Sequence, residues 1–163
     1  MMPLPLELLR RRISRELAVC RKITGVTVDG VAADGKMEFP ICLDVGVNGA
    51  SGLTLVDGAV KECELHRFSL EIGRDYPYQK PSLFWQTPIF HPNICPPEAG
   101  GMVCTRLLNE WKAERTISSL ICAVMYLIEH PNCREPLGSD ACMNAATYLL
   151  ERAANDCQNS EKS

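Results

Sequence analysis

The residue types that could carry out chemistry gather in one stretch of the chain, residues 91–111. A His-Pro-Asn sequence at 91–93 opens it, and Gly100 and Gly101 stand shortly before Cys104. Proline stiffens a backbone, and glycine lets another chain approach it closely where larger side chains would block the way. An exposed and unhindered thiol in such a setting is a nucleophile that can attack a thioester. Cys104 is therefore the candidate catalytic residue.

A side-chain amide close to this cysteine would help such chemistry. Asn93 carries an N–H donor and no charge, which suits it to stabilise the oxyanion that forms when a carbonyl is attacked. Losing one such donor typically lowers a rate by about 10²–10³. We expect His91 and Pro92 to shape the turn, with His91 as a structural hydrogen-bonding residue and not a base.

The composition limits the class of protein. A chain of 163 residues is about the size of one domain, and 46% hydrophobic with 23% charged residues is typical of a globular protein. A net charge of -3 gives no electrostatic reason to bind nucleic acid. No apolar run is long enough to cross a membrane, and the start lacks a signal-peptide pattern. We expect one domain over 1–157, a loose polar tail over 158–163, and a cytoplasmic protein.

The chain has nine cysteines, none of them in a Cys-x-x-Cys pair. A zinc ribbon or thioredoxin-like site is therefore not expected, and His91, Cys95 and Cys104 fit no standard zinc spacing. We predict no metal and no cofactor. Thiols inside a cell stay reduced, and most behave as small buried hydrophobic residues. We expect this of Cys42, Cys63 and Cys122, which lie within apolar-periodic segments.

The first part of the chain predicts a helix. Leucine and isoleucine recur at helical spacing over residues 5–22, with Pro5 in the first turn. The opposite face carries four arginines, Arg10, Arg11, Arg12 and Arg15. Such a cluster is either a solvated face or a surface that steers an acidic partner into place.

After residue 25 the hydrophobic period changes to two, which indicates strands. The apolar segments lie at 26–28, 37–45, 53–56, 59–72 and 83–85, and we expect an antiparallel meander of about four strands. Turn signals stand at Asp29-Gly30, Asp34-Gly35 and Asp57-Gly58. The segment 47–52 is rich in Gly, Ser and Asn, and reads as a loop.

Two helices are predicted after the irregular segment. Residues 116–119 begin a strongly apolar helix over 120–129. Such a helix must pack against the sheet, and Pro131 ends it. Ser139 or Asp140 caps a last helix to about Asn155. A helix, a run of strands and further helices give the α+β class.

The order of these features resembles the ubiquitin-conjugating enzyme family. The shared features are the first helix, the meander, the Tyr76-Pro77 corner, His-Pro-Asn at 91–93, Cys104, Trp111, the buried helix and Pro136-Leu137. No single element is decisive, but their joint order is specific and covers nearly the whole chain. The family's usual final helix is shortened or absent, which suggests a divergent or prokaryotic-type member.

The resemblance implies roles for individual residues. Cys104 would carry ubiquitin or a ubiquitin-like protein as a thioester and pass it to a lysine. Asn93 would act as oxyanion donor and partly hold its loop. The attacking lysine must lose a proton far below its ordinary pKa of about 10.4. In the family an acidic residue before Pro-Leu assists this step, and Glu135 occupies that place, where many relatives carry Asp.

The resemblance also implies partners. An activating enzyme and a ligase, with the RING type as the candidate, would bind the first helix and two loops. The residues at these surfaces are Arg10, Arg11, Arg12, Arg15, Pro77, Tyr78, Lys112 and Ala113. Two of these positions depart from the family pattern. Tyr78 stands where Phe is common, and Lys112-Ala113 replaces a frequent Pro-Ala pair, which weakens the expectation of an ordinary RING ligase.

Two other functions remain open from the sequence. An inactive family member that only binds ubiquitin-like proteins would lack the cysteine, whereas Cys104 is present. A cysteine hydrolase would pair Cys104 with a histidine such as His66, His91 or His130. No protease signature surrounds Cys104, and a hydrolase would destroy the thioester that a carrier must preserve.

Overall fold

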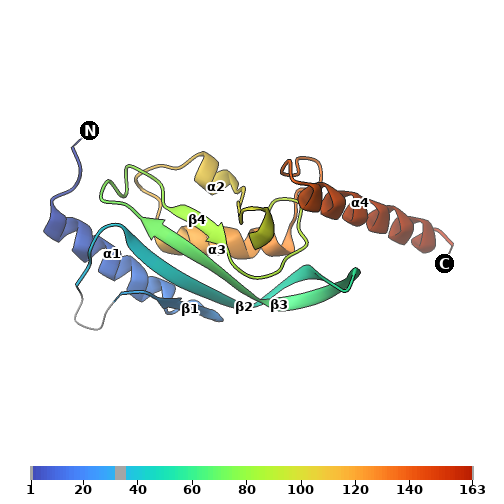
Figure 1. The fold of residues 1–163 in the computed structure, drawn as a ribbon, viewed down its shortest axis with the longest axis horizontal. Coiled ribbons are helices and arrows are strands. Elements are labelled where there is room, and N and C mark those ends of the chain that lie inside the picture. The colour runs from blue at the N-terminus through green and yellow to red at the C-terminus, as the bar shows by residue number, and fades with distance from the viewer. Residues whose placement is uncertain (1, 32–35, 163) are drawn as a thin grey trace.

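A computed structural model describes residues 2–31 and 36–162. The elements run α1 (Leu6–Cys20), β1 (Val26–Asp29), β2 (Ile41–Val56), β3 (Ala59–Ile72), β4 (Ser82–Trp85), a short 3-10 helix η1 (Pro97–Ala99), α2 (Arg106–Asn109), α3 (Ile117–Glu129) and α4 (Asp140–Ser160). The α+β class and the order of helix, strands and helices are as predicted (Figure 1).

The strands form one antiparallel sheet in the order β1-β2-β3-β4, which confirms the meander. Val45 pairs with Phe68, and Phe68 pairs with Trp85, so three apolar side chains line up across the sheet. The rings of Phe68 and Trp85 stack with centroids 5.6 Å apart. This face meets α3, which contacts β2, and α1 packs against α3 and β1.

The alternation of buried and exposed residues along the strands shows which sheet face is covered. In β2 the odd-numbered residues Ile41, Leu43 and Val45 are buried, because successive side chains of a strand point to opposite faces. On the helices, Leu9 and Ile13 of α1 are fully buried. Burying one such side chain stabilises the fold by about 1.5–3 kcal/mol.

The loop predicted over 47–52 is wrong. Residues 41–56 form one long strand, and the register slips between Asn48 and Gly52 as in a β-bulge. Gly49 has a φ of 102° within this irregularity, a conformation that glycine adopts without strain. The Gly-rich composition therefore marks a bulge and not a break. The turn predicted at Asp57-Gly58 is confirmed, and the one at Asp34-Gly35 lies outside the described residues.

The burial predicted for three cysteines is wrong. Cys42 and Cys122 are exposed and Cys63 is half-buried. Cys42 occupies an even position of β2 and so faces outward. The buried thiols are Cys20, Cys95 and Cys142, and the sulfurs of Cys95 and Cys142 lie 3.6 Å apart.

Helix α3 is bounded as the sequence predicts. Thr116 caps it, since its side chain accepts from Ser119 N while the Ser119 hydroxyl accepts from Thr116 N, which is a capping box. Helix α4 starts after Ser139, whose hydroxyl accepts from Cys142 N at 3.2 Å. It extends to Ser160, beyond the predicted end, so the expected loose tail is helical over residues 158–160.

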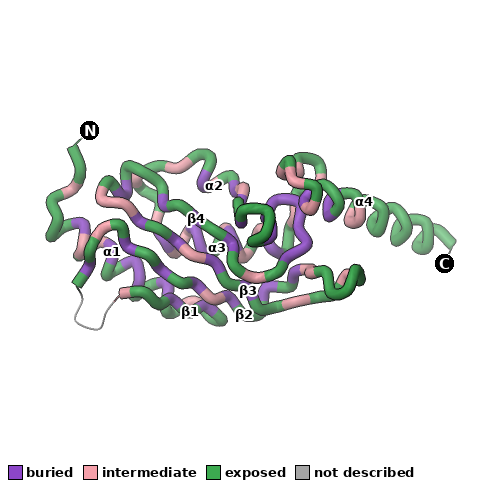
Figure 2. Tube along the Cα trace, in the orientation of Figure 1, coloured by how far each residue is buried: buried purple, intermediate pink, exposed green. Residues whose placement is uncertain are grey.

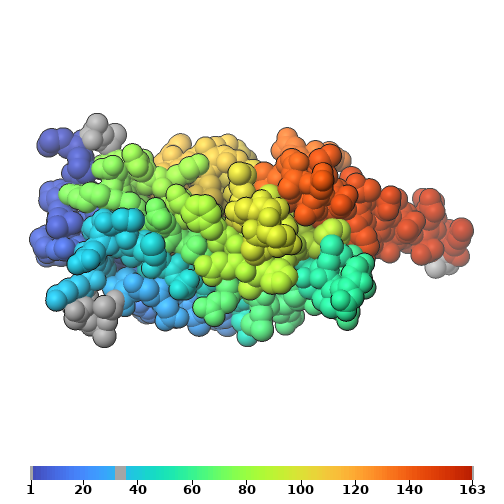
Figure 3. Space-filling view, in the orientation of Figure 1, coloured from blue at the N-terminus to red at the C-terminus, as the bar shows by residue number. Residues whose placement is uncertain are grey.

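The second half of α4 projects from the body of the molecule (Figure 3). Residues 151–160 are all exposed, whereas Cys142, Ala145 and Ala146 near its start are buried (Figure 2). Across the described residues, no helix combines the length and apolar character needed to cross a membrane.

Candidate active site

His91 fixes the start of the irregular segment. Its Nε2 bonds Leu127 O at 2.8 Å, and its Nδ1 accepts from Asn93 N at 3.0 Å. The second bond requires an unprotonated Nδ1, so the ring is neutral with hydrogen on Nε2. Burial lowers the pKa of His91 to about 4. The expected structural role of His91 agrees with this geometry, because a ring with both nitrogens engaged has no capacity to act as a base.

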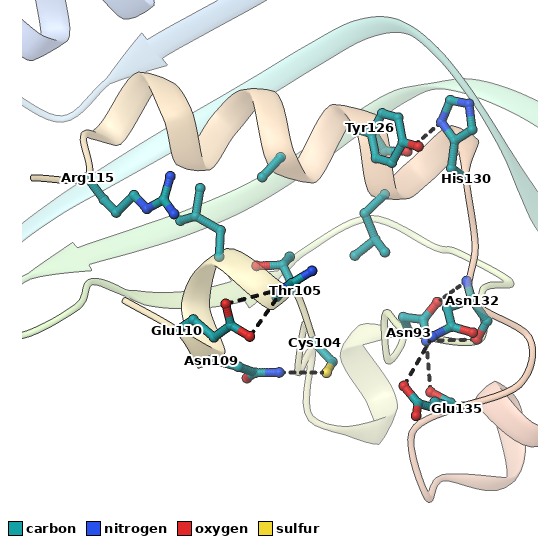
Figure 4. A pocket seen from close by; sticks show the side chains of 14 residues that line it. Asn93, Cys104, Thr105, Asn109, Glu110, Arg115, Tyr126, His130, Asn132 and Glu135 are labelled. Carbon is teal, nitrogen blue, oxygen red and sulfur yellow. Dashed lines mark hydrogen bonds and ion pairs between the residues drawn. The ribbon is translucent and has the colours of Figure 1, made fainter. Parts of the chain in front are cut away.

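Asn93 is turned toward the loop that precedes α4 (Figure 4). Its Nδ2 donates to Asn132 O at 3.1 Å and to Glu135 O at 3.0 Å, and its Oδ1 accepts from Asn132 N at 2.7 Å. Both amide protons are therefore engaged with backbone carbonyls. In this arrangement the side chain holds the loop, which is the second role expected of it, and its part in stabilising an oxyanion stays a prediction.

We expect Asn93→Ala to lower the free energy of unfolding by about 1–3 kcal/mol. The change removes three hydrogen bonds around a side chain only 3% exposed and leaves backbone groups of 132 and 135 without partners. Urea denaturation measures the loss. Asn155→Ala, on the exposed half of α4, is the matched control and should change nothing. An Asn93→Ala protein of full stability would contradict the loop-holding role.

The loop that Asn93 holds carries Glu135. The carboxylate is exposed, and its Oε2 accepts from Asn132 Nδ2 at 3.3 Å. Just after it, Leu137 N donates to Pro92 O at 2.8 Å. The His-Pro-Asn turn and the 132–137 loop are thus joined by several hydrogen bonds, which fixes the position of Glu135 relative to the turn.

Cys104 lies beside this joined pair of segments. Its backbone N donates to Asn93 O at 2.9 Å, and neighbouring Val103 forms a β-bridge with Ile94. The thiol is partly exposed and lines a groove of about 780 Å³. Asn93, Tyr126 and Glu135 line the same groove (Figure 4). The thiol is therefore accessible from the groove.

The short helix after Cys104 places a side-chain amide next to the Cys104 sulfur. Thr105 caps α2 by accepting from Leu108 N at 3.1 Å, and Leu108 is buried. Asn109 at the end of this single turn donates from Nδ2 to Cys104 Sγ at 3.5 Å. The sequence analysis did not identify Asn109; the available signal was a polar residue one helical turn after the Thr105 cap.

The hydrolase and zinc alternatives lose support from this geometry. None of the three histidines has a recorded hydrogen bond to Cys104 Sγ within the part of the chain that the structure describes. His66 is buried and bonds Ala50 O, and burial lowers its pKa. His91 has no free nitrogen for a metal. His130 lines the groove, but its Nδ1 bonds Tyr126 O.

Comparison with known proteins gives a family. The sequence model of the family described as "Ubiquitin-conjugating enzyme" matches residues 53–154, which is more than half of the chain. The chain belongs to the ubiquitin-conjugating enzyme family. The match includes the His-Pro-Asn turn, Cys104, α3 and the 132–137 loop.

Individual relatives of this family member are eukaryotic. Ubiquitin-conjugating enzyme E2 S-A of Xenopus laevis is 31% identical over 129 residues, covering 76% of this chain and 53% of the relative. SUMO-conjugating enzyme UBC9 of Caenorhabditis elegans is 34% identical over 91 residues, covering 52% and 53%. The chain spans about half the length of these curated relatives. The prokaryotic-type origin stays a prediction.

The fold has the same family resemblance. S. cerevisiae Ubc12 superposes with a TM-score of 0.69 at 25% identity, covering 93% of this chain and 74% of that one. An E2 domain of a Toxoplasma gondii ubiquitin-conjugating enzyme superposes with a TM-score of 0.65 at 23% identity. The α+β fold is therefore that of the ubiquitin-conjugating enzymes.

The arginine cluster of this family member is only partly free for partners. Arg12 points inward, where its Nε pairs with Glu16 at 2.7 Å and its NH2 donates to Ala113 O and Arg115 O at 2.9 Å each. Arg10 is half-buried and pairs with Glu7. Arg12 is thus engaged within the chain, whereas Arg11 and Arg15 are exposed, and the docking role of the four arginines stays a prediction.

The two predicted partner loops also contain supporting residues. Pro77 is buried, and its carbonyl accepts from Trp111 Nε1 at 2.8 Å. Trp111 also contacts the buried Tyr76, with ring centroids 6.1 Å apart. Pro77 and Trp111 therefore hold the loops together. Tyr78, 39% exposed, and Lys112, also exposed, are the predicted contact residues that face outward.

Proposed function

We propose that the chain accepts ubiquitin or a ubiquitin-like protein from an activating enzyme as a thioester on Cys104 and transfers it to a substrate lysine. The observation that carries this proposal is the partly exposed Cys104 thiol in an open groove, within a segment that matches the conjugating-enzyme family. The open groove gives the extended end of another protein access to the sulfur. This arrangement favours a carrier over a module that only binds.

The proposed reaction has two exchanges at one carbonyl. The Cys104 thiolate attacks the thioester on the activating enzyme, a new C–S bond forms, and the enzyme's thiolate leaves. A lysine amine then attacks the same carbonyl, loses its proton, and expels Cys104 as a thiolate. ATP is consumed by the activating enzyme, so this chain itself needs no cofactor or metal.

Glu135 is our candidate for the lysine step. Its exposed carboxylate lines the groove that contains Cys104, and its backbone is held by Asn93. A carboxylate near the approaching ammonium group orients it and accepts its proton, a contribution that typically accounts for 10²–10⁴-fold in rate. Glu135 acts after loading and has no part in the first exchange.

We expect Glu135→Gln to slow transfer to free lysine by about 10²-fold at neutral pH while loading proceeds at the wild-type rate. The deficit should shrink as the pH rises toward the ordinary lysine pKa of about 10.4, because the amine then deprotonates without help. A single-turnover discharge assay over this pH range measures both. Glu98→Gln, an exposed change in η1, is the matched control. Equal slowing of loading would contradict the assigned role.

We place the partners on the outward-facing residues of the two predicted surfaces. Arg11 and Arg15 on α1 lie on the side expected to meet an acidic activating enzyme. Tyr78 and Lys112 offer an aromatic and a basic contact to a ligase, for which the RING type is the candidate. No nucleic acid or membrane is part of the proposal. We further propose a cytoplasmic protein with one catalytic domain over residues 1–157.

One incubation tests the proposal. The wild-type chain is mixed with ATP and with ubiquitin or SUMO, each together with its own activating enzyme. We expect an adduct with at least one modifier that survives non-reducing gel electrophoresis and disappears with dithiothreitol. The absence of a reducible adduct with every modifier tested, from a folded protein, would contradict the proposed function.

A further inference from the structure

A side-chain amide contacts the sulfur of Cys104, and it belongs to Asn109. The Asn109 Nδ2 donates a hydrogen bond to the Cys104 Sγ over a distance of 3.5 Å. Figure 4 shows the Asn109 amide directed at Cys104 from one side of the groove, while Asn93 faces the 132–135 loop on the other. The amide that contacts the sulfur therefore comes from α2.

In this structure the Asn93 amide faces the loop before α4 and makes its hydrogen bonds there. Its two amide protons are donated to carbonyls of residues 132 and 135 at 3.1 and 3.0 Å. Redirecting one of them would leave a carbonyl of a part-buried loop unsatisfied, at a cost of about 1–3 kcal/mol. The Asn109 amide instead donates to the Sγ of Cys104, so moving it toward the reacting carbonyl breaks no hydrogen bond to a backbone carbonyl that the structure shows in the described residues.

The short helix α2 holds Asn109 in place. Asn109 N donates to Thr105 O at 3.1 Å, which closes the turn directly after Cys104. The buried Leu108 fixes the turn to the core, and Lys80 Nζ donates to Leu108 O at 3.3 Å. A donor whose backbone is fixed loses little freedom when it meets the developing charge, which is what makes such a group effective.

We infer that Asn109 is a catalytic residue of the thioester site, donating a hydrogen bond to the carbonyl oxygen of the modifier as it becomes negatively charged. The inference rests on the proposed function. That oxygen is two bonds from Sγ, so an amide already in contact with the sulfur reaches it by a small rotation of the side chain. Asn109 transfers no proton: the electron pair moves to oxygen on attack and returns when the C–S bond breaks.

The same amide serves both ends of the lysine step. While the tetrahedral intermediate exists, the N–H stabilises the oxyanion. As the C–S bond breaks, Cys104 leaves as a thiolate, and the contact seen at 3.5 Å between Nδ2 and Sγ is the one that stabilises it. The effect should therefore appear in both loading and discharge, which distinguishes Asn109 from Glu135.

The test uses single-turnover loading and discharge of the full chain with ubiquitin or SUMO as probe. Asn109→Ala should load and discharge to free lysine about 10²-fold more slowly, the lower end for an oxyanion donor because the groove is open to water. Asn109→Asp keeps the shape but removes the donor and adds negative charge, so it should be at least as slow. Asn155→Ala is the matched control and should react at the wild-type rate.

Thermal melting shows whether the variants are folded. Asn109 is exposed, so we expect unchanged melting temperatures, unlike Asn93→Ala. Wild-type rates for Asn109→Ala in a protein that forms the thioester would overturn the role of Asn109 and leave the proposed function standing. Loading and discharge rates near wild type for Asn109→Asp, with slow rates for Asn109→Ala, would also overturn the role, because aspartate has the shape of asparagine but no N–H donor. A wild-type chain that forms no thioester would overturn both.

Discussion

Replacing Cys104 with serine should abolish transfer of the modifier to lysine. A hydroxyl is a far weaker nucleophile than a thiolate at neutral pH, and an ester is less readily attacked by an amine than a thioester. If the activating enzyme loads the serine at all, the adduct will be an oxyester that resists dithiothreitol and is cleaved by hydroxylamine. Cys104→Ala should give no adduct. Non-reducing gels with and without each reagent distinguish these outcomes.

Cys42→Ala is the control for this experiment. Cys42 is another exposed thiol, but it lies on the outer face of β2 and outside the groove. It should load and discharge as the wild type does. A reducible adduct of equal yield on the Cys104→Ala protein would show that another of the nine cysteines carries the modifier, and the site proposed here would be wrong.

The sheet and helices could be predicted because their hydrophobic periods are strong. Alternation identified β1, the long arm of β3 and the pairing across Asp57-Gly58, and the Thr116 cap marked the start of α3. The bulge in β2 could not be predicted in this way. Glycine and serine weaken the periodic signal whether the chain leaves the sheet or only slips its register, and the pairing of Gly52 with Cys63 depends on the partner strand.

Within the site, residue types predicted which groups matter but not where their donors point. Asn93 was expected close to Cys104 in space, and its backbone carbonyl accepts from Cys104 N at 2.9 Å. The direction of its amide is set by carbonyls of Asn132 and Glu135, some 40 residues later in the chain. Asn109 became visible only when α2 brought it back to the sulfur.

The different surroundings of the four arginines could not be predicted for a similar reason. Four arginines on one helix look equivalent in sequence, and helical period separates a polar face from an apolar one. The helical period does not show that the buried Glu16 on the same helix will pair with one of the arginines, Arg12. Glu16 lies one turn after Arg12 and accepts from its Nε at 2.7 Å, so the Arg12 guanidinium is held within the chain.

Replacing Glu16 with alanine should lower the free energy of unfolding by about 3 kcal/mol. Glu16 is 8% exposed, and besides Arg12 its carboxylate accepts from the Tyr76 hydroxyl at 2.5 Å and from Ile117 N at 2.9 Å. Burial and the Glu16 carboxylate raise the pKa of Tyr76, which therefore stays a neutral donor. Breaking a buried charge pair costs about 3–5 kcal/mol. The lower end applies here, because Arg12 keeps two carbonyl acceptors.

Differential scanning calorimetry should show a melting temperature lower by about 6–12 °C, since 1 kcal/mol corresponds to roughly 2–4 °C for a domain of this size. Glu7→Ala is the matched control on the same helix, where an exposed carboxylate pairs with Arg10, and it should change stability by no more than about 1 kcal/mol. Equal effects of the two changes would mean that the Glu16 network contributes no more than a surface ion pair. The result bears on function, because Glu16 bonds the first residue of α3 and, through Arg12, the 113–115 loop, and so ties α1 to the helix that lines the Cys104 groove.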